Sequence, residues 1–269
     1  LDLLLGQGWY EGPADKRAET QLTMLAALGL SYYSLRFVDA GEGGGVKNAM
    51  QLNRKEIRKL KKLHAEFGIG VSSIGSPIGK VKLLDEEDGS QNAFVPFARY
   101  LKNDVARAIN LALEFDTKLI RGFSFYPPRG KSPEDYVSHA SERLSRIAEA
   151  CQAAGVFFGL EVEANLVGRN GRLLKRLSRQ VNNPHLYLIF DGGNLSTQNM
   201  GPEETYREYE AMKAGIGWMH TNAHGGRDTV HFQNPAAMQF LDGKHLVFLD
   251  GHVAYYTPEQ WAVQVRADW

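Results

Sequence analysis

Short apolar runs alternate with longer amphipathic stretches along the chain. This alternation is typical of parallel strands joined by crossover helices, and it predicts an α/β fold. Eight runs are predicted to be strands: residues 2–5, 32–38, 69–75, 118–124, 156–161, 186–191, 216–220 and 245–249. Eight such units in a chain of 269 residues fit a (β/α)8 TIM barrel, which typically takes about 250 residues.

Between these runs, apolar residues recur at helical spacing. The sets are Leu22, Leu25 and Ala26; Ile57, Leu60, His64 and Phe67; Val105, Ile109 and Leu113; and Leu144, Ile147, Ala148 and Cys151. Each set is predicted to pack one face of a helix on the sheet. Gly29, Gly68 and Gly155 follow three of the sets, at positions where glycine commonly ends a helix. Cys151 is the only cysteine, and its place on an apolar stripe predicts a buried thiol instead of a nucleophile.

Eight strands with helices between them can also form an open, doubly wound sheet. A dinucleotide-binding sheet of that kind carries GxGxxG at a strand-to-helix turn, whereas Gly41 to Gly45 follow the second predicted strand without that spacing. We therefore favour the barrel and predict no dinucleotide site. No linker or shift of composition divides the sequence, so residues 1–269 are predicted to form one domain.

The 31 basic and 31 acidic residues balance, which argues against nucleic acid as a partner and favours a small molecule. No apolar run reaches the ~18 residues that suggest a membrane span. The first residues lack the basic flank and cleavage site of a signal peptide, so the expected location is the cytoplasm. A homo-oligomer is compatible with the sequence, which does not set the oligomeric state.

Three consecutive predicted strands end in residues that bind metals: Glu161, Asp191 and His220. Functional side chains gather at the C-terminal ends of barrel strands. The runs VFFGLE and LYLIFD are apolar until their last residue, and a carboxylate in such a place needs a counter-charge. A divalent cation would supply it, and Mn²⁺, Mg²⁺, Zn²⁺ and Co²⁺ all accept carboxylate and imidazole ligands. The alternative is that these carboxylates cap helices or pair with Arg or Lys.

Five segments carry a resemblance to a known family. They are VSSIGSPIGK (71–80), LIRGFSFYPPRG (119–130), LEVEANLVGRN (160–170), LIFDGGN (188–194) and WMHTNAHGG (218–226). In these segments the chain resembles the xylose-isomerase-like TIM-barrel superfamily, often called sugar phosphate isomerases/epimerases. The resemblance extends from about residue 50 to residue 224.

The resemblance implies that Glu161, Asp191 and His220 are the ligands of one divalent metal ion, and that Glu161 is also the catalytic group. The implied contacts of the substrate or its phosphate are Lys80, Arg121 and Asn194. Glu163 competes with Glu161, because residues two apart in a strand share a face. The match to the family segment favours Glu161.

The sequence departs from the family pattern after the histidine. The family's Lys and Asp are replaced here by Asn222 and Ala223. The family also has a glutamate ligand at the end of its eighth strand, where this chain offers Asp250 if that strand lies at 245–249. Comparison with the family instead makes residues 257–268 the penultimate helix and leaves the last strand out of this sequence. The eighth βα unit is therefore predicted to be incomplete or irregular, and both placements stay open.

The leading hypothesis is a divalent-metal-dependent isomerase or epimerase of a sugar or sugar phosphate. The metal would stabilise the enediolate that forms when Glu161, or an acid of the eighth strand, removes the proton beside a carbonyl group. A polyol-ketone dehydratase would use the same site, and a non-catalytic sugar-binding barrel that has lost part of the metal site is the alternative from another class. An abasic-site nuclease is disfavoured, because that activity normally needs several zinc ions and a basic face.

Overall fold

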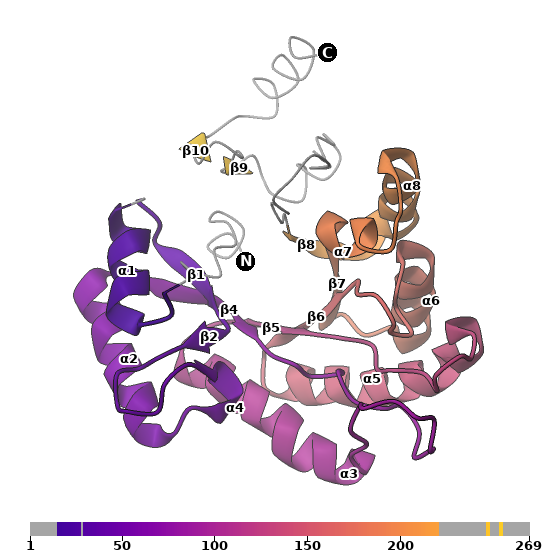
Figure 1. The fold of residues 1–269 in the computed structure, drawn as a ribbon, viewed down its shortest axis with the longest axis horizontal. Coiled ribbons are helices and arrows are strands. Elements are labelled where there is room, and N and C mark those ends of the chain that lie inside the picture. The colour runs from indigo at the N-terminus through magenta and orange to yellow at the C-terminus, as the bar shows by residue number, and fades with distance from the viewer. Residues whose placement is uncertain (1–14, 28, 221–245, 248–252, 255–269) are drawn as a thin grey trace.

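A computed structural model describes residues 15–27, 29–220, 246–247 and 253–254 of the chain. Its central feature is a parallel sheet with the strand order β1-β4-β5-β6-β7-β8. The strands are β1 (Tyr32–Leu35), β4 (Gly70–Gly75), β5 (Leu119–Gly122), β6 (Phe157–Glu161), β7 (Leu186–Asp191) and β8 (Ile216–His220). Each strand lies beside the next in chain order, and Figure 1 shows the sheet curling along an arc. This curled sheet is a half-barrel.

The six strands fall within six of the eight predicted runs. The predicted strand at 2–5 lies outside the described residues. Of the predicted strand at 245–249, the structure describes β9 (Leu246–Val247), which pairs antiparallel with β10 (Val253–Ala254) in a sheet of its own. Asp250 lies outside the described residues.

The prediction of one strand over 32–38 is wrong in its second half. β1 ends at Leu35, and β2 (Phe37–Val38) pairs antiparallel with β3 (Lys47–Asn48). The loop returns to this point, since the Ala49 amide donates a hydrogen bond to the Arg36 carbonyl oxygen at 2.7 Å. The chain therefore leaves the parallel sheet at Arg36.

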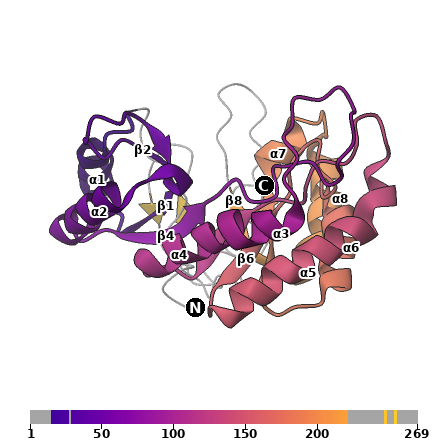
Figure 2. The same cartoon turned by 90° about the horizontal axis from the view of Figure 1, so that it is seen from below.

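Helices flank the sheet, and most of them cover its convex side. They are α1 (Ala18–Ala27), α2 (Arg54–Phe67), α3 (Phe97–Tyr100), α4 (Ala106–Glu114), α5 (Val137–Ala153), α6 (Gly171–Val181), α7 (Gly192–Ser196) and α8 (Pro202–Met212). Short 3-10 turns occur at Ala49–Gln51, Pro133–Tyr136 and Lys213–Gly215, and a π turn at Leu101–Val105 precedes α4. In Figure 2, α4, α5 and α6 follow one another along the outside of the strands. The helices in the described part of the chain include none with the length and hydrophobicity of a membrane span.

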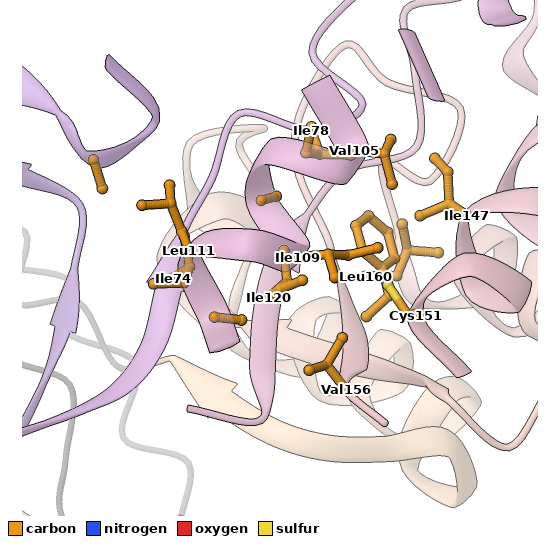
Figure 3. Close-up of a cluster of buried hydrophobic side chains, with 14 of the residues drawn as sticks. Ile74, Ile78, Val105, Ile109, Leu111, Ile120, Ile147, Cys151, Val156 and Leu160 are labelled. Carbon is orange, nitrogen blue, oxygen red and sulfur yellow. The ribbon is translucent and has the colours of Figure 1, made fainter. Parts of the chain in front are cut away.

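The main hydrophobic core lies between the sheet and these helices. Figure 3 shows Ile120 of β5 and Leu160 of β6 among side chains of α4 and α5, including Ile147 and Cys151. All four side chains are at most 1% exposed, and burying each aliphatic one stabilises the fold by about 1.5–3 kcal/mol. The prediction of a buried Cys151 is confirmed, and burial raises the pKa of its thiol to about 12.

Two predicted core positions are wrong, Ala26 of α1 and Leu113 of α4, because both are exposed. Leu113 is 50% exposed, whereas Ala108 and Ala112 of the same helix are buried. An α-helix has about 3.6 residues per turn, so Leu113, eight residues after Val105, is rotated off the packed face. The predicted end of α2 is confirmed, because Gly68 caps that helix with a φ of 65° in the left-handed region.

Candidate metal centre

Alternation along the strands gives the concave side of the sheet its own set of side chains. A second, small apolar cluster lies apart from the main core and is formed by Leu119, Phe157, Ile189 and Trp218. Side chains an even number of residues further along the same strands share that face. These are Arg121, Glu161, Asp191 and His220. Each sits at or next to the C-terminal end of its strand, so one edge of the half-barrel carries all four.

Glu161, Asp191 and His220 come together at this edge. Asp191 and His220 are register partners in β7 and β8, and Glu161 pairs with Ile189 in the neighbouring ladder of β6 and β7. The Nδ1 atom of His220 lies 2.8 Å from Oε1 of Glu161 and 3.7 Å from Oδ2 of Asp191. One ligand atom from each residue lies within 4.8 Å of the other two. The three side chains are buried, with relative exposures of 4%, 2% and 1%.

Asn194, three residues after Asp191, fixes both carboxylates. Its backbone amide donates to Oδ1 of Asp191 at 2.9 Å, which makes Asp191 the N-cap of α7. Its side-chain amide donates to Oε1 of Glu161 at 3.3 Å and to the carbonyl oxygen of Val162 at 3.0 Å. Asn194 therefore orients the cluster, while its predicted contact with substrate stays a prediction.

Arg121 supplies positive charge to the cluster. Its Nη1 atom lies 3.2 Å from Oε2 of Glu161. Burial raises the pKa of Glu161, but interactions with His220 and Arg121 outweigh burial and lower this pKa to about 2. Burial raises the pKa of Asp191, and interactions with His220 oppose that rise only in part. Glu161 is thus a carboxylate at neutral pH.

The three residues fit a divalent metal ion. Metal–ligand bonds of about 2.0–2.2 Å place neighbouring ligand atoms roughly 3–4 Å apart, which is the spacing around Nδ1 of His220. Oε2 of Glu161 is buried and accepts no hydrogen bond from the described residues, so one carboxylate oxygen retains coordinating capacity. Two carboxylates and one imidazole suit Mn²⁺, Mg²⁺, Zn²⁺ or Co²⁺.

A second ion pair lies next to the cluster. Nζ of Lys80, after β4, lies 2.8 Å from Oε2 of Glu163, after β6. Since β5 is between β4 and β6 in the sheet, this pair spans the end of β5. Phe123 follows β5. The centroid of its ring lies 4.2 Å from Lys80 Nζ and 4.7 Å from the Arg121 guanidinium carbon.

The loop that carries Lys80 is held by its backbone. Phe123 and Phe125 donate backbone hydrogen bonds to the carbonyl oxygens of Ile78 and Gly79, at 2.7 and 2.9 Å. Gly79 has a φ of 89°, and a Cβ atom there would lie 2.0 Å from the Phe123 carbonyl oxygen. Only glycine fits at this position. The close contact between this loop and the chain after β5 therefore fixes the backbone position of Lys80.

The structure thus places all six predicted site residues at one edge of the sheet: Lys80, Arg121, Glu161, Asp191, Asn194 and His220. Sequence reasoning missed that Glu163 pairs with Lys80, a contact 83 residues apart in the chain. The adjacency of Phe123 to both cations was missed as well, because only the pairing of neighbouring strands creates it. Asn222 and Ala223 lie outside the described residues.

Comparison with known proteins identifies a family. The family model described as "Xylose isomerase-like TIM barrel" matches residues 22–258. No curated protein sequence gives a significant match.

Several solved structures share the fold. D-psicose 3-epimerase from Clostridium cellulolyticum H10, solved with D-tagatose, superposes with a TM-score of 0.59 at 14% identity, covering 87% of this chain and 80% of that one. A xylose isomerase-like TIM barrel protein from Mycobacterium smegmatis, in complex with magnesium, gives 0.56 at 16% identity over 75% and 65% of the two chains. The probable 3-DHS dehydratase of Bacillus anthracis gives 0.54 at 15% identity over 78% and 76%. At sequence identities this low, the structural similarities show a shared fold and nothing more.

Proposed function

Because the chain belongs to the xylose isomerase-like TIM barrel family, we propose that it is a divalent-metal-dependent sugar isomerase or epimerase. The observation that carries the proposal is the convergence of Glu161, Asp191 and His220 from three adjacent strands, with ligand atoms within 4.8 Å of one another. D-psicose 3-epimerase, which has the same fold, supports a ketose as the kind of substrate. The magnesium-bound relative supports the metal.

A divalent ion, when bound, would polarise neighbouring hydroxyl and carbonyl oxygens of the sugar and acidify the hydrogen on the carbon beside the carbonyl. Glu161, Asp191 and His220 would hold this ion. Glu161 would take the proton as the general base and return it to the same or the neighbouring carbon. With its pKa at about 2 it is ionised at neutral pH, which is the form that a general base requires.

The surrounding residues keep Glu161 in place for this transfer. Arg121 balances its charge through Oε2, and Asn194 holds Oε1. A base held from both oxygens loses little orientational freedom when the substrate arrives. Burial of the cluster also keeps bulk water away from the proton in transit.

The test is exchange of substrate hydrogen with solvent. A panel of ketoses is incubated in D2O with the Mn²⁺-loaded protein, and deuterium beside the carbonyl is followed by NMR together with the products. We expect metal-dependent exchange and a rearranged sugar, both abolished in Glu161→Gln. The matched control Glu149→Gln alters an exposed carboxylate of α5 and should retain exchange.

Three outcomes would change the account. Exchange that persists in Glu161→Gln and disappears in Glu163→Gln would move the base to Glu163. Net loss of water from the substrate would make the protein a dehydratase on the same site. Absence of exchange above the protein-free rate would contradict the enzymatic proposal and leave a sugar-binding barrel.

A further inference from the structure

The Lys80–Glu163 pair lies next to the metal centre, at the same edge of the sheet. It spans the end of β5, and Phe123 links it to Arg121, which pairs with Glu161. The side chains of Lys80 and Glu163 are 30% and 23% exposed, whereas those of Arg121 and Glu161 are 5% exposed each. A bound molecule can therefore reach the first pair directly, while the second pair is enclosed by protein.

The two cations that Phe123 contacts, Lys80 and Arg121, are each matched with a carboxylate. Four basic side chains on or after β4, β5 and β6 are paired: Lys80 with Glu163, Lys82 with Asp88, Arg121 with Glu161 and Arg169 with Glu134, at 2.8, 2.8, 3.2 and 3.6 Å. A phosphate ester carries about −1.5 to −2 charges at neutral pH. To bind it, Lys80 would have to leave Glu163, and the Glu163 carboxylate would then repel the phosphate.

A hydroxyl group suits an ammonium–carboxylate pair better than an anion does. Its oxygen accepts a hydrogen bond from the ammonium group, and its hydrogen is donated to the carboxylate. Hydrogen bonds to charged groups are stronger than those between neutral groups. The pair is neutral overall, so a neutral polyol binds without separating the two charges.

We propose that Lys80 and Glu163 form a hydroxyl-binding subsite, and that the substrate class is an uncharged sugar or polyol ketone instead of a sugar phosphate. This inference rests on the proposed function, because it takes the Glu161, Asp191 and His220 cluster as the reacting end. The metal centre holds the carbonyl end, and the Lys80–Glu163 pair binds a hydroxyl further along the same molecule. Glu163 excludes the phosphorylated form.

The test compares free ketohexoses with their 6-phosphates. Binding of D-fructose, D-psicose and D-tagatose and of the three phosphates to the Mn²⁺-loaded protein is measured by calorimetry, and D2O exchange is recorded on the same samples. The wild type should bind its best free sugar at least tenfold more tightly than the phosphate of that sugar. Glu163→Gln should weaken binding of the free sugar and strengthen binding of the sugar phosphate, so that the preference falls at least tenfold. Glu149→Gln should leave the preference unchanged.

Lys80→Met separates a polar subsite from a merely structural ion pair. It should weaken free-sugar binding about tenfold while leaving Mn²⁺ affinity as in the wild type. A wild type that binds a phosphate as tightly as the free sugar, or a preference unaltered by Glu163→Gln, overturns the inference while exchange shows that the proposed function stands. If no sugar binds or exchanges, the proposed function fails and takes the inference with it.

Discussion

The Nη1 atom of Arg121 lies 3.2 Å from the Oε2 atom of Glu161, and both side chains are 5% exposed. This pair joins β5 to β6 on the concave face of the sheet. It places a fixed positive charge beside the carboxylate that we propose as both base and metal ligand. In the metal-free protein this positive charge stabilises the buried Glu161 carboxylate. When a metal is bound, it also contributes to the electrostatics of the site.

Arg121→Met should therefore destabilise the metal-free protein. Removing one partner of a buried ion pair leaves an uncompensated charge and costs about 3–5 kcal/mol. We expect the free energy of unfolding in urea, measured with a chelator present, to fall by about 3 kcal/mol. Adding Mn²⁺ should recover part of this loss, since the ion replaces the missing counter-charge.

Arg146→Met is the matched control, because Arg146 pairs with Glu149 at the surface with both side chains more than 60% exposed. Exposed pairs contribute about 0–1 kcal/mol. Equal losses in the two variants would show that the Arg121–Glu161 pair has no special weight.

Gly79 should tolerate no side chain. Its φ of 89° disfavours other residues, and a Cβ atom would lie 2.0 Å from the Phe123 carbonyl oxygen. Gly130→Ala is the control, since Gly130 has a φ of 77° and open space around it. Gly130→Ala should cost about 1 kcal/mol from backbone strain alone, and Gly79→Ala at least about 2 kcal/mol more in urea unfolding. Similar losses would contradict the close packing of the Lys80 loop on β5.

His64 should make stability depend on pH. Burial lowers its pKa to about 4, and its Nε2 atom lies 2.9 Å from the Tyr33 hydroxyl oxygen. Between the unfolded-state pKa of about 6.5 and the folded-state value, the unfolded chain binds a proton that the folded chain does not. The contribution of this group to stability is therefore lost as the pH falls from about 6.5 to about 4, by about 3 kcal/mol in all.

Urea unfolding at pH 7 and pH 4.5 measures this effect. His64→Gln should lose less stability over the interval than the wild type, because the glutamine side chain does not titrate. His139→Gln, which changes an exposed histidine of α5, should behave as the wild type. If the free energy of unfolding of His64→Gln falls between pH 7 and pH 4.5 as much as that of the wild type, the pH dependence belongs to other groups.

The strands β6 and β7 were predictable because their apolar runs are buried on both faces and continue to the last residue. The polar residues that end these two runs were visible for the same reason, since Glu161 and Asp191 interrupt otherwise apolar segments. The sequence of each run does not show which side chain pairs with its charged residue. Arg121 was predicted as a substrate contact, and only the pairing of β5 with β6 shows that it faces Glu161.

Two local features escaped the periodicity argument for different reasons. The run at 32–38 is mostly apolar up to its last residue, but Phe37 and Val38 pair with the returning loop at β3 instead of the sheet. Leu113 belongs to a helical repeat, yet the repeat of four residues drifts around the helix and places it in solvent. Hydrophobicity alone does not distinguish these cases from core positions.

The most direct test of the account is the metal content of the purified protein, by equilibrium dialysis against Mn²⁺, with Asp191→Asn beside the wild type. Asparagine caps helices as well as aspartate does, so this variant keeps the N-cap of α7 and loses only the charge. The account predicts one Mn²⁺ per wild-type chain and an Mn²⁺ affinity at least tenfold lower in Asp191→Asn. The control Glu149→Gln should bind Mn²⁺ with the affinity of the wild type. A wild type that binds no stoichiometric Mn²⁺, Zn²⁺, Mg²⁺ or Co²⁺, or equal Mn²⁺ affinity in Asp191→Asn, would contradict a metal centre at Glu161, Asp191 and His220.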